Sequence, residues 1–222
     1  MKVVLFDIDG TLVSTGGAGR VAMRNGFKAV VGRDDVFDFS LGGMTDRGIV
    51  RKALLNANVE PESALIDTIL DAYLDLLTDE VRLAQNFQTF ESARTLAKAL
   101  NRADFAVGLG TGNIEKGARI KLDRPGLNQE FSFGGFGCDD ELRPNLIQAG
   151  LNRGRDLLND PKAAGVIIGD TPLDVQAAHA IGAQCIAVAT GGFPAQKLAE
   201  YQPVLVVEDL SDPRVLTFFG LA

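Results

Sequence analysis

Residues 3–12 read Val-Val-Leu-Phe-Asp-Ile-Asp-Gly-Thr-Leu, an apolar run that ends abruptly in two carboxylates. Because this run has no polar face, it is typical of a strand buried on both sides in a parallel sheet. Asp7 and Asp9 follow two residues apart, and an extended backbone would point both side chains the same way. Ligands of open parallel sheets bind at the carboxyl ends of the strands. We therefore expect Asp7 and Asp9 to lie in a functional site.

Similar apolar runs recur along the chain. They lie at residues 105–109, 131–136, 166–168, 185–188 and 204–207. Helical spacing of apolar residues separates them, first at residues 93–100 and later at residues 175–181, where Gly182 is suited to end the helix. This alternation predicts an α/β fold with a doubly wound, mainly parallel sheet.

One long stretch, residues 14–84, shows only helical periodicity. Val21, Met23 and Phe27 belong to one apolar pattern in it, and Tyr73 and Leu77 belong to another. We predict an all-α cap domain over residues 14–84, inserted into an α/β core of residues 1–13 and 85–222. The glycine-rich entry of the insert is suited to act as a hinge.

Composition excludes several classes of protein. With 222 residues, 46% hydrophobic and 23% charged, the chain is ordinary globular protein rather than a disordered chain. Two cysteines and one histidine cannot build a disulfide framework or a histidine-rich metal site. The net charge of −7 lacks the basic excess of a nucleic-acid binder. With no signal-like or membrane-spanning run, we expect a cytoplasmic protein without nucleic-acid or membrane partners.

Polar clusters follow several of the predicted strands. They lie at residues 7–11, 110–113, 137–140 and 169–174. Asp7, Asp9 and Asp170 would converge at one edge of the sheet, and carboxylates this close repel unless a cation or a shared proton lies between them. Hard oxygen ligands of this kind suit Mg²⁺. The alternative, that each aspartate only caps a helix or turn, explains their repetition at successive strand ends less well.

These clusters resemble the motifs of the haloacid dehalogenase-like superfamily. The first motif is matched by Phe-Asp-Ile-Asp-Gly-Thr-Leu at residues 6–12, the second by Gly-Thr-Gly-Asn at 110–113. The acidic fourth motif is matched by residues 169–174, Gly-Asp-Thr-Pro-Leu-Asp. The third motif usually carries lysine, and here Arg143, followed by Pro144, is the best match. With its helical insert, the chain is similar to the phosphoglycolate phosphatase and β-phosphoglucomutase branch, which has a Rossmann-like core.

The resemblance implies a Mg²⁺-dependent phosphatase of a small organic phosphate monoester. Asp7 would attack phosphorus and form an aspartyl-phosphate, and Asp9 would serve first as general acid and then as general base. The metal ligands would be the side chains of Asp7 and Asp170 and the backbone carbonyl of Asp9.

The resemblance also implies which residues hold the substrate, a small phosphorylated metabolite. Thr111, Gly112, Asn113 and Arg143 would bind phosphate, and Asp174 would orient Arg143 or a metal-bound water. Residues 42–47 resemble the cap loop that faces the active site, so Thr45 and Arg47 are candidates for substrate specificity. Arg47 is equally well read as a surface residue. Members of this kind are expected to be monomers or homodimers.

Two other functions stay open at this point. The same aspartyl-phosphate would serve a sugar phosphomutase, which returns the phosphoryl group to its substrate, and the core residues do not separate the two. A non-catalytic phospho-acceptor module fits less well, because it needs only one compact domain and no large helical insert.

Overall fold

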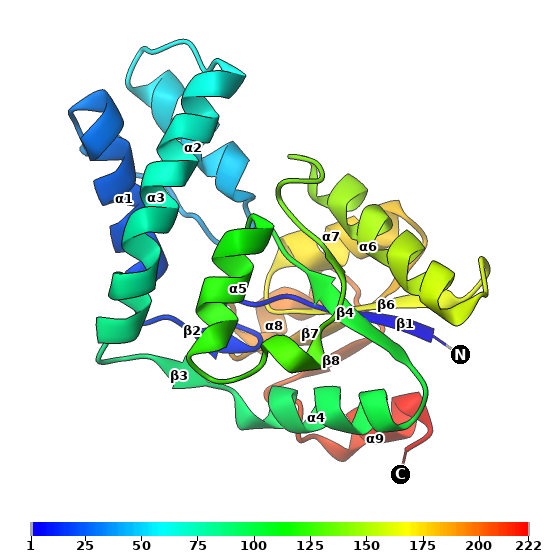
Figure 1. Cartoon of the computed structure of the whole chain (residues 1–222). Helices are drawn as coiled ribbons and strands as arrows, with labels where there is room; N and C mark the ends of the chain where they lie inside the picture. Colours follow the sequence, from blue (N-terminus) through cyan, green and yellow to red (C-terminus); the bar gives the residue numbers. More distant parts are fainter. Residues whose placement is uncertain (1, 222) are drawn as a thin grey trace.

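A parallel sheet forms the centre of the computed structural model, which describes residues 2–221 (Figure 1). Within that range six strands pair in the order β5-β4-β1-β6-β7-β8, and every pairing is parallel. The strands are β1 (Lys2–Phe6), β4 (Ala106–Gly110), β5 (Gly134–Gly135), β6 (Ala164–Gly169), β7 (Gln184–Val188) and β8 (Leu205–Val207). The predicted α/β fold with a parallel sheet is confirmed.

Helices cover both faces of this sheet. One face carries α4 (Glu91–Arg102), α5 (Glu115–Asp123) and α9 (Pro213–Phe219), and the other carries α6 (Arg143–Leu158), α7 (Pro172–Ala180) and α8 (Ala195–Ala199). Figure 1 shows α4 and α9 on one side and α6 and α7 on the other. Along β1, Val4 and Phe6 are buried in the first layer, and Val3 and Leu5 in the second. Burial on both sides explains why β1 is an unbroken apolar run.

The apolar run at residues 131–136 is not the strand that its sequence suggested. Only Gly134–Gly135 forms β5, and a 3₁₀ turn, η1 (Asn128–Glu130), precedes it. Phe131 is fully buried outside any strand, and its ring lies edge-on to that of Phe6 with centroids 5.7 Å apart. An apolar run indicates that its residues are buried, and the residues of a buried loop give the same pattern as those of a buried strand.

The insert consists of α1 (Ala18–Val31), α2 (Asp46–Asn56) and α3 (Ser63–Leu83), which bury a core of their own. They form the separate group of helices at the left of Figure 1, and we call this insert the cap. Two short strands, β2 (Val13–Ser14) and β3 (Gln88–Thr89), pair antiparallel where the chain enters and leaves it. The predicted helical insert is therefore confirmed, and the exact domain boundaries stay a prediction. Within residues 2–221, no helix has the length and hydrophobicity to cross a membrane.

Glycines bring α6 very close to the sheet. A Cβ atom on Gly135 would lie 1.9 Å from the carbonyl oxygen of Leu146, and one on Gly154 would lie 2.3 Å from Cγ1 of Val3. Because α6 follows β5, its first residue, Arg143, lies near the carboxyl edge of the sheet. The close approach of α6 thus helps to place a cation at that edge.

We predict that Gly135→Ala lowers the free energy of unfolding by about 2 kcal/mol or more, because a methyl group would meet backbone atoms that cannot rotate away. Urea denaturation followed by circular dichroism would measure this loss. Gly192→Ala is the matched control, since no atom lies within 4 Å of its added Cβ. Equal stability of the two variants would contradict this account of α6 packing.

Candidate active site

A cavity of about 330 Å³ lies between the cap and the carboxyl ends of the central strands. Its core-side lining comprises Asp7, Asp9, Thr111, Gly112, Asn113, Lys121, Arg143, Asp170 and Thr171. Its cap-side lining includes Thr15, Arg20, Met23, residues 40–44, Asp46, Ile49 and Tyr73. The structure thus brings together the strand-end residues that the sequence analysis selected after β1, β4 and β6.

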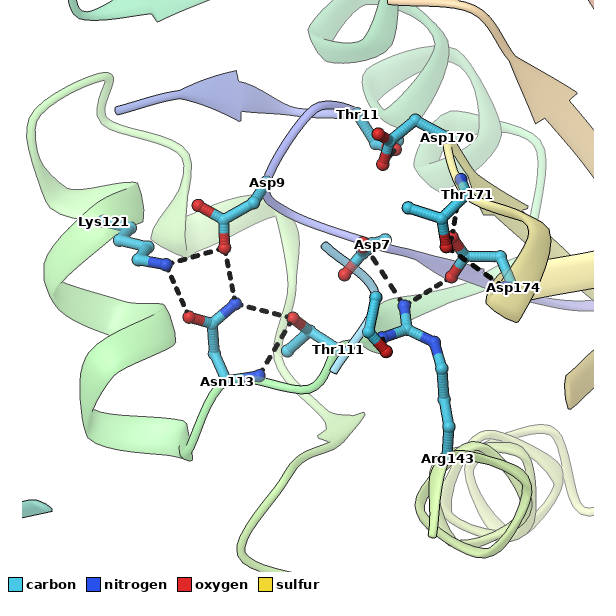
Figure 2. A network of polar contacts seen from close by, with 11 residues as sticks. Asp7, Asp9, Thr11, Thr111, Asn113, Lys121, Arg143, Asp170, Thr171 and Asp174 are labelled. Atoms are coloured by element: carbon cyan, nitrogen blue, oxygen red, sulfur yellow. Dashed lines mark hydrogen bonds and ion pairs between the residues drawn. The ribbon is translucent and has the colours of Figure 1, made fainter. Parts of the chain in front are cut away.

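Asp7 and Asp174 share one buried cation, the guanidinium of Arg143 (Figure 2). Nη2 of Arg143 lies 3.3 Å from Oδ2 of Asp7 and donates a hydrogen bond to Oδ1 of Asp174. Nη1 donates to the backbone carbonyl of Gly43 in the cap at 3.1 Å. The planar fork of arginine suits such a set of acceptors, whereas a lysine ammonium would present a single point charge.

Asp174 is held by its own helix as well. Its Oδ2 accepts hydrogen bonds from the backbone N–H of Thr171 at 3.0 Å and from the Thr171 hydroxyl at 2.7 Å, a capping box at the start of α7. With Oδ1 facing Arg143, both oxygens of Asp174 have partners. This arrangement supports the predicted role of Asp174 as a residue that orients Arg143.

Asp170 is enclosed by two glycines. A Cβ atom on Gly10, whose φ is +87°, would lie 2.4 Å from Oδ2 of Asp170, and one on Gly191 would lie 1.7 Å from the same atom. The Thr11 hydroxyl donates to Oδ1 of Asp170 at 3.3 Å. The glycine of the first motif is therefore required here, because the loop after β1 passes directly over this carboxylate.

Three buried carboxylates crowd this part of the cavity. Oxygens of Asp7, Asp170 and Asp174 lie within 4.8 Å of one another. Burial raises the pKa of Asp7, against the opposing effect of Arg143, and burial together with the charge of Asp7 raises the pKa of Asp170. Arg143 alone therefore does not offset the negative charge, and this set of oxygen donors fits a divalent cation such as Mg²⁺. Asp7 and Asp170 would hold the ion, and the backbone carbonyl of Asp9 stays a predicted ligand.

Asp9 turns away from Asp7 toward a second cation, Lys121. Nζ of Lys121 lies 2.6 Å from Oδ2 of Asp9, and Nδ2 of Asn113 donates to the same oxygen at 2.8 Å. Asp7 and Asp9 line the same cavity but meet different cations, because β1 ends at Phe6 and the chain bends at Ile8. Side-chain alternation holds only in extended backbone.

Asn113 links Asp9 to the predicted phosphate-binding residues. Its Nδ2 also donates to Oγ1 of Thr111 at 2.8 Å, and its backbone N–H donates to that oxygen at 3.3 Å. With these bonds accepted, the Thr111 hydroxyl hydrogen is directed elsewhere, and Thr111 lines the cavity. A side chain would not fit at Gly112, because a Cβ atom there would lie 2.2 Å from the carbonyl oxygen of Met44.

Sequence reasoning missed Lys121. It lies on α5 in the apolar stripe with Ala118 and Leu122, and all three are buried. Its position on the apolar face of a predicted helix could have identified it. A lysine there would be buried, and a buried ammonium requires a charged or polar partner.

The cap loop reaches the core through Thr45 and Asp46. The Thr45 hydroxyl donates to the carbonyl of Glu141 at 3.2 Å and accepts from the N–H of Gly48, which caps α2. Asp46 was not selected from the sequence, yet it is buried and its Oδ2 accepts from the N–H of Ile114 at 2.9 Å. Cap and core are therefore in contact along one side of the cavity.

Arg47 is not brought to the site. It forms an ion pair with Asp67 of α3 and does not belong to the residues that line the cavity. Arg20 lines it instead, with its guanidinium donating to the carbonyls of Phe37 at 3.2 Å and Phe39 at 2.9 Å. A specificity role of Arg47 stays a prediction without support from this placement.

The acidic residues after β5 also lie outside the site. Asp139 is paired with Arg153 at 2.6 Å, and the Asp140 carboxylate accepts from the N–H of Leu142 at 2.7 Å. Neither lines the cavity. The polar cluster at residues 137–140 therefore contributes no carboxylate to the site. Arg143, a few residues further on, lines the cavity instead.

Known proteins resemble this chain over nearly its whole length. A family model described as haloacid dehalogenase-like hydrolase matches residues 1–182. Phosphoglycolate phosphatase of Pseudomonas syringae pv. tomato is 27% identical over 213 residues, covering 94% of this chain and 77% of that protein. A hydrolase from Pseudomonas syringae has a similar structure, with a TM-score of 0.71 at 18% identity and complete coverage of both chains. CbbY from Rhodobacter sphaeroides in complex with phosphate has a TM-score of 0.75 at 18% identity, covering 96% of each chain.

The fold and site together define a hydrolase with a Rossmann-like core and a helical cap, as the sequence indicated. Since the family model matches most of the chain, the chain belongs to the haloacid dehalogenase-like hydrolases. The curated relatives are phosphatases.

We predict that Asp46→Asn makes the protein more stable above about pH 6. Burial raises the pKa of Asp46 to about 6 from 3.8, despite the attraction of Lys121. The folded state disfavours the ionised carboxyl, so ionisation of Asp46 lowers the free energy of unfolding. The full loss is present above about pH 6, and it disappears as the pH falls toward 3.8. The amide keeps an acceptor for the N–H of Ile114 and removes the charge.

The expected gain in free energy of unfolding at pH 7.5 is about 1–3 kcal/mol. Urea denaturation between pH 4 and pH 8 would measure it, with the exposed Asp75→Asn as control. A variant less stable than wild type at pH 7.5 would show that the carboxylate charge is needed for docking of the cap.

Proposed function

We propose that the chain is a Mg²⁺-dependent phosphatase that hydrolyses a small organic phosphate monoester through an aspartyl-phosphate on Asp7. The observation that carries the proposal is the placement of Asp7. It is a buried carboxylate that lines a cavity of about 330 Å³, between the guanidinium of Arg143 and the Asp170 carboxylate. A nucleophile in a small anion-binding cavity suits a small substrate.

The residues of the site divide the work of phosphoryl transfer. Bound Mg²⁺ would neutralise charge between the phosphate and the carboxylates of Asp7 and Asp170. A carboxylate oxygen of Asp7 attacks phosphorus, while Asp9 gives a proton to the departing alkoxide. Asp9 then takes a proton from the water that cleaves the aspartyl-phosphate. Arg143 and the Thr111 hydroxyl donate hydrogen bonds to phosphoryl oxygens.

The similarity to phosphoglycolate phosphatases supports a substrate of that kind, a phosphate monoester with a carboxylate. Arg20, which lines the cap side of the cavity, offers a positive charge for such a group. A monomeric or dimeric state and a cytoplasmic location stay predictions.

We expect Asp7→Asn to lower phosphate release from phosphoglycolate by at least about 10³-fold, because it removes the nucleophile. A phosphate-release assay over a panel of monoesters with Mg²⁺ would measure it, beside Asp71→Asn, an exposed cap residue, as control. Chelation with EDTA should abolish release by the wild type, and added Mg²⁺ should restore it.

Undiminished release by Asp7→Asn would contradict the proposed nucleophile. Interconversion of sugar-phosphate isomers without release of phosphate would contradict the phosphatase and indicate a mutase.

A further inference from the structure

Lys121 is a buried cation that the proposed mechanism does not use. Its side chain is 6% exposed, and its ammonium lies 2.6 Å from Oδ2 of Asp9 and 2.6 Å from Oδ1 of Asn113 (Figure 2). An ammonium is buried at a high cost unless charged and polar partners receive it. Lys121 therefore belongs to a specific arrangement around Asp9.

The two oxygens of Asp9 have different surroundings. Oδ2 accepts from both Lys121 and Nδ2 of Asn113, and Oδ1 has no hydrogen-bond partner among residues 2–221. The Asp9 side chain is 43% exposed and lines the cavity. Two donors thus hold one oxygen in place, and the other oxygen remains available to a molecule in the cavity.

Other charged groups near Lys121 do not account for its position. Asp46, on the cap side, is attracted to it, but the hydrogen bond of the Asp46 carboxylate goes to the N–H of Ile114. Asp7, on the core side, faces it from a greater distance and pairs with Arg143. The short contacts of Lys121 are those to Asp9 and Asn113.

The cap leaves room for this ammonium. A Cβ atom on Gly19 of α1 would lie 3.3 Å from Nζ of Lys121, so a glycine of the cap covers the charge. Lys121 is consequently enclosed between α5 of the core and α1 of the cap, beside the cavity.

We propose that Lys121 is a positioning residue which, with Asn113, orients the carboxyl of Asp9 so that Oδ1 exchanges the proton during catalysis. The inference deepens the proposed phosphatase function and rests on it. As the bond from phosphorus to the leaving oxygen breaks and the bond to Asp7 forms, the proton on Oδ1 passes to the leaving alkoxide. In the second step Oδ1 takes a proton from water as its oxygen bonds to phosphorus and the bond to Asp7 breaks.

Lys121→Met tests this role, because methionine keeps the length of the side chain and removes the charge. An alkyl phosphate needs a proton on its leaving oxygen, whereas p-nitrophenyl phosphate releases a stable phenolate without one. The two substrates share the later hydrolysis of the aspartyl-phosphate, so the comparison uses kcat/KM, which covers only the steps up to departure of the leaving group. We expect kcat/KM to fall about 10²-fold for the alkyl phosphate and only a few-fold for p-nitrophenyl phosphate. Lys116→Met, an exposed lysine of the same helix, is the matched control and should change neither rate.

A loss that is equal for both substrates would mean that Lys121 only maintains the structure, and no loss for either would mean that Asp9 is oriented without it. Lys121→Gln keeps a neutral donor to Asp9 and should show a smaller loss with the same preference for p-nitrophenyl phosphate. It also serves as the deciding variant if Lys121→Met does not fold.

Crystal structures of the wild type and of these variants give a readout that does not depend on turnover. We expect the Asp9 side chain to occupy a different or a second rotamer when Lys121 is replaced, and an unchanged Asp9 would overturn the inference. A wild type that hydrolyses neither substrate would contradict the proposed function, and the orientation of Asp9 would then still decide the role of Lys121.

Discussion

The burial of Arg143 between Asp7 and Asp174 is the interaction on which the rest of the site depends. Carboxylates this close to one another repel strongly in a buried site, and Arg143 offsets part of that repulsion. The close approach of α6 to the sheet at Gly135 and Gly154 helps to bring the guanidinium to them. The charge balance of the site thus depends in part on how α6 packs against the sheet. The negative charge that Arg143 does not offset favours a divalent cation.

The same contacts join the cap to the core. Arg143 donates to the carbonyl of Gly43, and the N–H of Asp46 donates to the carbonyl of Gly112 at 2.8 Å. Residues 42–46 therefore contact Gly112 and Arg143, two of the predicted phosphate-binding residues. Movement of the cap about its glycine-rich entry would break these contacts.

The sequence predicted what depends on local pattern and on the geometry of parallel sheets. The apolar run before Asp7 gave the central strand, and the rule that strand ends share one edge brought Asp170 and Thr111 to the same cavity. Lys121 and Asp46 could not be found in this way, because their burial depends on how α5 packs against the cap. Arg47 was predicted to lie at the site because its loop resembles a cap loop that faces the active site, but Arg47 forms an ion pair with Asp67 instead.

Asp7 and Asp9 are separated by a single residue and yet have opposite surroundings. Both line the cavity, but Asp7 is buried beside Arg143, whereas the Asp9 side chain is partly exposed and has one oxygen held by Lys121 and Asn113. The bend at Ile8 is what allows two neighbouring carboxylates to meet different cations. Since charges are screened beyond about 8 Å at physiological salt, these local cations together with a bound Mg²⁺, rather than the net charge of −7, would decide how the site attracts an anionic substrate. A nucleophile must stay fixed and ionised, and a proton carrier must keep one oxygen free, so the two cations would serve two different chemical requirements.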